Sequence, residues 1–101
     1  MATSLTSKQR RHLKGLAHGS RPPLFQVGRE GLSEQVVRSL DAALDDHELI
    51  KVQFLEGADI DRKDYARQLS EQLDAALVQL IGFKAVYYRP RKENPRIVLP
   101  Q

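Results

Sequence analysis

The sequence of 101 residues contains no cysteine. This absence excludes disulfides, a thiolate metal site and a thiol nucleophile, and it suits a reducing compartment, so we expect a cytoplasmic protein. No apolar run approaches the roughly 20 residues of a membrane span. The first residues, MATSLTSKQRRHLK, lack the apolar core of a signal peptide. We therefore expect neither membrane insertion nor secretion.

Sequence patterns of catalysis are also missing. There is no P-loop lysine signature and no G-x-G-x-x-G motif, which disfavours nucleotide cofactors. His12 and His18 are six residues apart and so do not form a helical metal pair, and His47 is remote from both. Four carboxylates are expected to form a solvated surface rather than an acid–base or metal cluster: Asp41, Asp45, Asp46 and Glu48. We expect no enzymatic activity, no metal, no cofactor and no small-molecule substrate.

Acidic residues are absent from one end of the chain. Residues 1–29 hold six basic side chains and no acid, residues 30–83 hold five basic and twelve acidic side chains, and residues 84–101 hold five basic side chains and one acid. The hydrophobic fraction of 41% suffices for one domain with a modest core. If the two basic ends meet in space, a polyanion such as nucleic acid is the leading partner.

The first basic segment reads as a helix over residues 6–18. Thr6 and Gln9 have the spacing of a capping box, and Gly19 is a typical C-terminal stop. At 100° per residue, Leu13 and Ala17 fall on an apolar stripe. A wide basic arc is predicted on the other side of the helix: Lys8, Arg10, Arg11, Lys14 and His18.

The rest of the chain alternates strands and helices. Strands are predicted at 24–27, 50–54, 76–81 and 85–88, with a short edge strand at 97–99. Two further helices are predicted, one capped by Ser33 and ending near His47, the other capped by Asp61. The order αβαβαββ predicts an α/β (α+β) two-layer sandwich. Tyr87 and Tyr88 point to opposite faces, so one is expected in the core and the other is exposed or stacks on a base.

A strand–loop–helix unit at residues 24–44 is the most informative feature for function. Gly28 and Gly31 let the backbone approach a ligand closely, and the following helix directs unpaired N–H groups at that point. Phosphate is the natural occupant, with Arg29 as an added cation. RNA-binding modules of the KH type use such a G-x-x-G loop to clamp the nucleic-acid backbone. A tight turn without a ligand is the alternative.

Several separated motifs together resemble a known family. HLKGLAHG, VGREGLSE, HELIKV, IG…YYRP and a closing VLP resemble the YhbY type of the CRM domain (chloroplast RNA splicing and ribosome maturation). The resemblance covers residues 4–100. It implies a single RNA-binding domain over residues 1–101, with a basic tail at 90–101. The implied topology is similar to that of the C-terminal domain of bacterial translation initiation factor three.

The resemblance also implies a function and a set of RNA-binding residues. Stand-alone bacterial members associate with precursors of the large ribosomal subunit, so ribosomal RNA is the expected partner, with ribosomal proteins as a further class. The family's basic helix, loop and late strand with tail map onto these residues: Lys8, Arg11, Lys14, Gly28, Arg29, Gly31, Lys84, Arg89 and Arg91. Two departures are Glu30, an acid inside the loop, and the stretch Leu73-Asp74-Ala75, where relatives often turn with glycine.

Two other functions remain open from the sequence. One is a general nucleic-acid-binding module, which would bind duplex DNA as well as single-stranded RNA. The other is a protein-interaction adaptor that docks on ribosomal proteins through the acidic middle of the chain.

Overall fold

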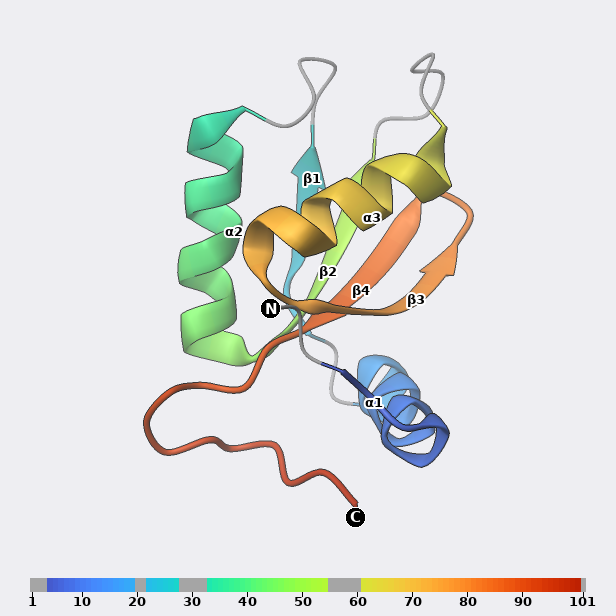
Figure 1. Cartoon of the computed structure of the whole chain (residues 1–101), viewed down its shortest axis with the longest axis vertical. Helices are drawn as coiled ribbons and strands as arrows, with labels where there is room; N and C mark the ends of the chain where they lie inside the picture. Colours follow the sequence, from blue (N-terminus) through green and yellow to red (C-terminus); the bar gives the residue numbers. More distant parts are fainter. Residues whose placement is uncertain (1–3, 20–21, 28–32, 55–60, 101) are drawn as a thin grey trace.

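The computed structural model describes residues 4–19, 22–27, 33–54 and 61–100. Helices and strands alternate along these residues in the predicted order αβαβαββ, which is thereby confirmed (Figure 1). The elements are α1 (Ser7–Gly19), β1 (Leu24–Val27), α2 (Glu34–His47), β2 (Leu49–Phe54), α3 (Arg62–Leu73), β3 (Ala76–Ile81) and β4 (Lys84–Tyr88).

The four strands form one mixed sheet in the order β1-β2-β4-β3. β1 runs parallel to β2 through the crossover helix α2, and β4 is antiparallel to both β2 and β3. Helices α2 and α3 cover one face of this sheet (Figure 1). Their buried side chains, such as Leu44 and Leu69, pack on Ile50, Val52 and Tyr87 of the central strands. This helix layer and the sheet confirm the predicted α+β class.

Helix α1 and the C-terminal segment pack on the other face of the sheet. Leu13 and Ala17 of α1 form a second buried cluster with Leu49, Val86 and Tyr88. Tyr87 and Tyr88 do point to opposite faces, but both are buried, with exposed fractions of 0% and 2%. The prediction that one of them is exposed or stacks on a base is therefore wrong, because α1 and the C-terminal segment cover Tyr88.

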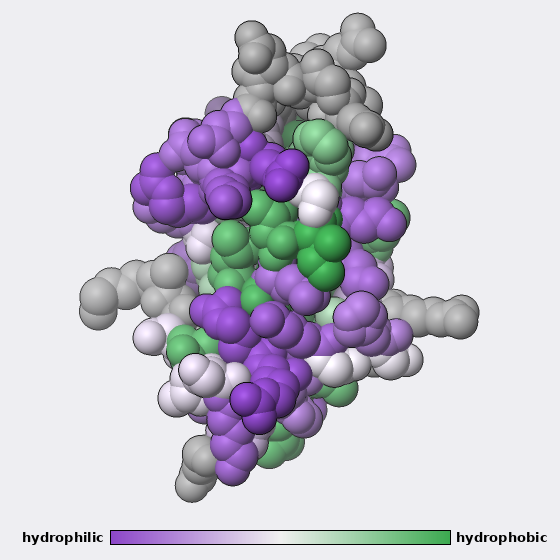
Figure 2. Space-filling model, turned by 90° about the vertical axis from the view of Figure 1, so that its right-hand side faces the viewer, coloured by the Kyte–Doolittle hydropathy of each residue, from purple (hydrophilic) through white to green (hydrophobic). Residues whose placement is uncertain are grey.

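Strand β3 forms one edge of the sheet, and part of it is exposed. Figure 2 looks onto this side of the molecule and shows apolar side chains gathered between hydrophilic regions. Ile81, at the end of β3, has an exposed fraction of 59%. A register shift between Leu77 and Gln79 marks a bulge in the pairing of β3 with β4. This edge therefore presents both apolar side chains and irregular backbone.

The predicted helix starts are confirmed by their hydrogen bonds. In α1 the backbone N–H of Gln9 donates to Oγ1 of Thr6 at 3.1 Å, and the N–H of Thr6 donates to Oε1 of Gln9 at 3.0 Å. These two bonds are the capping box. Oγ of Ser33 accepts from the N–H of Val36 at 3.1 Å, which caps α2. The hydroxyl and carboxamide oxygens of these caps thus accept from N–H groups that a helix leaves unpaired.

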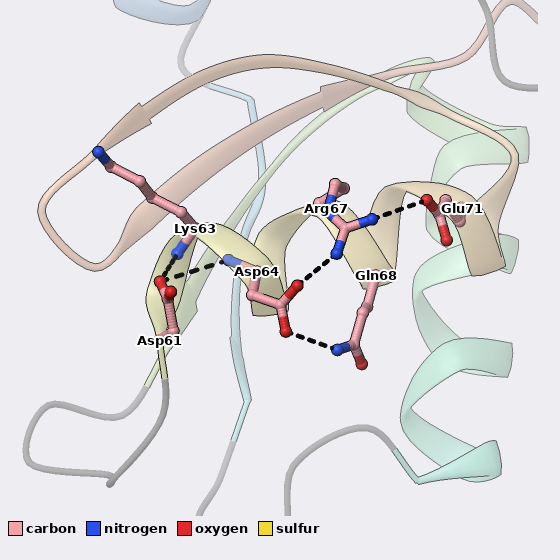
Figure 3. Close-up of polar contacts among 6 residues, drawn as sticks. All are labelled: Asp61, Lys63, Asp64, Arg67, Gln68 and Glu71. Atoms are coloured by element: carbon pink, nitrogen blue, oxygen red, sulfur yellow. Dashed lines mark hydrogen bonds and ion pairs between the residues drawn. The ribbon is translucent and has the colours of Figure 1, made fainter.

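Helix α3 begins at a carboxylate cap and is reinforced along its exposed face (Figure 3). Asp61 accepts from the N–H of Lys63 at 3.0 Å. Arg67 then pairs with Asp64 and Glu71, one turn away on either side. The hydrogen bond from Arg67 lowers the pKa of the Asp64 carboxyl below its usual value. The helix ends at Leu73, and Asp74 adopts a left-handed conformation with φ of 50°.

The predicted edge strand at residues 97–99 does not form. These residues lie in the C-terminal segment, outside the strands of the sheet. The N–H of Ile97 donates to a side chain, Oε1 of Glu48, at 3.0 Å. A side-chain acceptor thus takes the bond that a strand would give to a neighbouring backbone.

Candidate nucleic-acid interface

Helix α1 carries its cations on the side away from its buried stripe. Leu13 is fully buried, whereas Lys8 and Arg11 are exposed and Lys14 is half-buried. Arg10 is partly buried, and its guanidinium donates to the backbone oxygen of Val78 at 3.0 Å and to that of Leu77. These carbonyls lie at the β3 bulge. Arg10, which was expected on the basic arc, therefore fastens α1 to the edge of the sheet.

The two basic ends of the chain meet at α1. Nε2 of Gln9 donates to the backbone oxygen of Pro100 at 3.1 Å. Ile97 and Leu99 pack against the cluster that contains Leu13 and Ala17. The two basic ends therefore meet in space, which is the condition under which the charge distribution indicates a polyanionic partner.

The C-terminal segment is held by a buried carboxylate. Oε1 of Glu48 accepts from the N–H groups of Arg96 at 2.7 Å and Ile97 at 3.0 Å, and Oε2 accepts from that of Arg91 at 3.0 Å. Glu48 is fully buried and ends α2 with φ of 66°. The expectation of a solvated surface is wrong for Glu48, because these three amides replace water around its charge.

Arg89 also has intramolecular partners. Its guanidinium donates to Oδ1 of Asp41 at 2.5 Å and to Oδ1 of Asp45 at 3.0 Å. It donates further to the backbone oxygen of Leu73 at 2.7 Å, and the side chain is only 18% exposed. Arg89 therefore joins the C-terminal ends of α2 and α3, and Asp41 and Asp45 are its ion-pair partners.

The remaining predicted site residues lie at other places. Lys84 is exposed at the start of β4, where it pairs with Gln53 of β2 and Ile81 of β3. Arg91 is half-buried in the C-terminal segment. The loop residues of the prediction lie outside the described residues: Gly28, Arg29, Glu30 and Gly31. The structure thus brings α1 and the C-terminal segment together and puts Lys84 on the sheet.

Charge is segregated between the two faces of the sheet. Neither α1 nor any of the four strands contains an acidic residue. These elements carry six cations: Lys8, Arg10, Arg11, Lys14, Lys51 and Lys84. On the opposite face, α2 contains four acids and one arginine, and α3 contains two acids and three cations. An anionic ligand is therefore attracted to the α1 side of the sheet.

Comparison with known proteins identifies the family of the chain. Residues 5–89 match the CRS1/YhbY (CRM) domain. The chain belongs to the CRS1/YhbY family. A Bacillus subtilis relative named "Probable RNA-binding protein YqeI" is 41% identical over 95% of this chain and 99% of its own length. A Haemophilus influenzae relative named "RNA-binding protein" is 42% identical, over 98% of both chains.

A solved CRM-type structure confirms the fold. The solution structure of a hypothetical protein from Staphylococcus aureus superposes with a TM-score of 0.79 and 44% sequence identity. The match covers 96% of this chain and all of the other. The resemblance inferred from separated sequence motifs is therefore confirmed at the level of family and fold. Within the described parts of this CRM chain, no helix is long and apolar enough to cross a membrane.

Proposed function

We propose that this CRM-domain protein is a non-enzymatic RNA-binding protein that associates with precursors of the large ribosomal subunit and assists their assembly. The observation that carries the proposal is the acid-free surface formed by α1 and the sheet. Phosphate contacts from lysine and arginine dominate the affinity of proteins for nucleic acid. The names of its relatives as RNA-binding proteins support the same conclusion.

In the proposed binding mode, several elements on the α1 side of the sheet contact the RNA. Lys8, Arg11 and Lys14 contact phosphates from α1, and Lys84 does so from the sheet. The Gly28–Gly31 loop approaches the RNA backbone, and Arg91 contributes from the C-terminal segment. Arg89 has no part in this mode, because its guanidinium is bound to Asp41 and Asp45. Helix α2 faces away from the RNA, and its carboxylates oppose non-specific adhesion.

The first prediction tests the phosphate contacts of α1. Replacing Lys8, Arg11 and Lys14 together by alanine should weaken RNA binding and flatten its salt dependence. Each lost phosphate contact removes roughly 0.7–0.9 from the slope of log affinity against log salt concentration. The measurement is fluorescence anisotropy of a labelled single-stranded RNA across a salt series. A matched control replaces three exposed cations of α2 and α3 by alanine: Arg38, Arg62 and Lys63.

The same variants test the association with ribosomal precursors. The unmodified protein and the control should sediment with precursors of the large subunit in cell extracts, whereas the α1 variant should not. An unchanged salt slope in a folded α1 variant contradicts the binding mode. Equal affinity for duplex DNA and single-stranded RNA would support a general nucleic-acid-binding module instead. Persistent ribosome association of the α1 variant would support a protein-interaction adaptor.

A further inference from the structure

The face of the sheet on which α1 packs is only partly covered. Alternation along each strand determines which side chains lie on it. Ile50, Val52 and Phe54 belong to the core beneath α2 and α3, so Lys51 and Gln53 between them point to the opposite face. In β4, Val86 packs beneath α1, and Lys84, two residues before it, shares that face.

Two neighbouring rows of side chains cross all four strands on this face. The strand register gives the first row as Leu24, Lys51, Val86 and Gln79, and the second as Gln26, Gln53, Lys84 and Ile81. At an interstrand spacing of about 4.8 Å, each row spans about 14 Å. Only Val86 of these eight residues is buried. We name these two rows the open face of the sheet.

The open face has the side-chain chemistry that recognises RNA. Lys51 and Lys84 supply positive charge, and no strand supplies an acid. The three glutamine amides each offer donors and an acceptor. The side chains of Gln26, Gln53 and Gln79 have no hydrogen-bond partner among the described residues. Leu24 and Ile81, at opposite edges of the sheet, have exposed fractions of 47% and 59%.

Helix α1 lies along the border of the open face. Arg10 reaches from α1 to the backbone of β3, which shows that this side of the helix is turned to the β3 edge. Lys14 follows Arg10 by four residues and therefore lies one turn farther on the same side. Lys51 and Lys84 lie on the face of the sheet on which α1 packs, because Lys51 pairs with Val86 and Lys84 precedes Val86 by two residues.

We propose that the open face binds an unpaired segment of RNA. In this mode Lys51, Lys84 and α1 contact phosphates, while the glutamines hydrogen-bond base edges and the apolar ends of the rows contact base faces. Base edges are accessible in this way only in single strands, because RNA duplexes are recognised mostly by shape and backbone. Other four-stranded RNA-binding sheets hold two or three bases. The proposal rests on the proposed function, since it specifies which RNA the α1 side takes.

Two variants separate the charged from the neutral contacts. In the lysine variant, Lys51→Gln with Lys84→Gln, the salt slope for an unpaired RNA of about ten nucleotides should fall by roughly 1.4. In the glutamine variant, all three glutamines of the open face become alanine. Its affinity for the same RNA should fall by at least about tenfold with the slope unchanged, because neutral hydrogen bonds release no counterions.

Matched controls carry the same changes on the opposite helices. Gln35, Gln68 and Gln72 are exposed on α2 and α3, and their replacement by alanine should leave RNA affinity unchanged. A hairpin RNA serves as the duplex probe, and the glutamine variant should bind it as the unmodified protein does. Equal losses for hairpin and unpaired RNA would overturn the assignment to single strands. Circular dichroism checks that each variant is folded.

A second measurement uses the unmodified protein and so does not depend on any variant. On titration with the unpaired RNA, backbone amide resonances of residues 24–27, 51–53 and 79–86 should shift. Shifts confined to α1 and the C-terminal segment would overturn the inference. If the α1 variant loses binding while both sheet variants bind normally, the open face is not used although the proposed function stands. If the unmodified protein binds no RNA at all, the proposed function itself fails.

Discussion

At the residue scale, Glu48 explains the position of the whole C-terminal segment. A non-glycine residue at positive φ is strained by about 1–2 kcal/mol, and Glu48 has φ of 66°. Its carboxylate accepts three backbone N–H bonds from a segment more than forty residues away. Hydrogen bonds to an ionised group contribute about 1.5–3 kcal/mol. The conformation persists because these charge-assisted bonds exceed the cost of the backbone strain.

Glu48→Gln should therefore lower the free energy of unfolding by roughly 1.5–3 kcal/mol. The amide removes the charge and presents an NH₂ group where one carboxylate oxygen accepts from a backbone N–H. The measurement is urea unfolding followed by circular dichroism. Asp46→Asn, an exposed change in the same acidic run, is the control and should have little effect. Equal stability of the two variants would contradict the role of Glu48.

The buried tyrosines predict a loss of stability at alkaline pH. Burial raises the pKa of Tyr87 far above its usual value, with a further contribution from Tyr65, and burial also raises the pKa of Tyr88. A group whose pKa is higher in the folded state contributes its full stability below the unfolded value, which is about 10 for tyrosine. That contribution is lost as pH rises above about 10. The free energy of unfolding should fall over this range.

Tyr87→Phe separates this effect from other alkaline titrations. The hydroxyl of Tyr87 donates to the backbone oxygen of Ala66 at 2.9 Å, so its removal should cost about 1 kcal/mol at neutral pH. The variant should then lose less stability than the unmodified protein between neutral pH and pH values above about 10. Parallel curves for the two proteins would show that Tyr87 does not contribute to the alkaline loss.

At the element scale, the sequence predicts helix caps and turns, because these depend on residues that are close together in the chain. Thr6, Ser33 and Asp61 were identified as caps, and each accepts the expected backbone N–H bond. Gly82, with φ of 58°, lies in the short connection between the predicted strands at 76–81 and 85–88. Asp74 adopts a left-handed conformation of the kind that usually favours glycine, so α3 ends there without a glycine.

Contacts between distant parts of the chain could not be predicted in this way. Arg10 was predicted on the basic arc, Arg89 as an RNA-binding residue and Glu48 as solvated surface, yet all three bind distant backbone groups. Apart from the carboxylates of Asp41 and Asp45, which pair with Arg89, their partners are backbone carbonyls and amides, which every sequence segment offers equally. The strand predicted at 97–99 is missing for the same reason: the backbone N–H of Ile97 donates to the distant side chain of Glu48. No sequence pattern distinguishes such partners.

Helix α1 can be stabilised at Gly15 without any change in packing. A Cβ added at Gly15 meets no atom within 4 Å beyond its chain neighbours and the backbone of its own helix. Because alanine is a better helix former, Gly15→Ala should raise the free energy of unfolding by up to about 1 kcal/mol. Gly82→Ala is the contrasting change: its site is equally open, but φ of +58° makes the new side chain strained. If thermal unfolding shifts in the same direction for both variants, backbone conformation does not decide the outcome.

At the scale of the whole molecule, the two faces of the sheet differ in charge because the chain ends converge. Composition shows that both ends are basic. The structure brings them together through the hydrogen bond of Gln9 with Pro100 and through the packing of Ile97 and Leu99 against the cluster that contains Leu13. Four acids of the acidic middle lie in α2 on the opposite face. A charge distribution spread along the sequence thus becomes a difference between two sides of one sheet.

This separation predicts how the acids of α2 affect RNA binding. The two shorter dimensions of the molecule are 25 and 24 Å, whereas the screening length is about 8 Å at 0.15 M salt and about 30 Å at 0.01 M. Neutralising Glu34 and Asp46, both exposed on α2, should therefore change RNA affinity less than about twofold at 0.15 M salt and raise it more at 0.01 M. Anisotropy titrations at the two salt concentrations measure this difference. A many-fold rise at the higher concentration would place α2 against the RNA, contrary to the proposed binding mode. Unchanged RNA affinity with lost association to ribosomal precursors would instead assign the acidic face to a protein partner, because only a direct contact on α2 escapes screening.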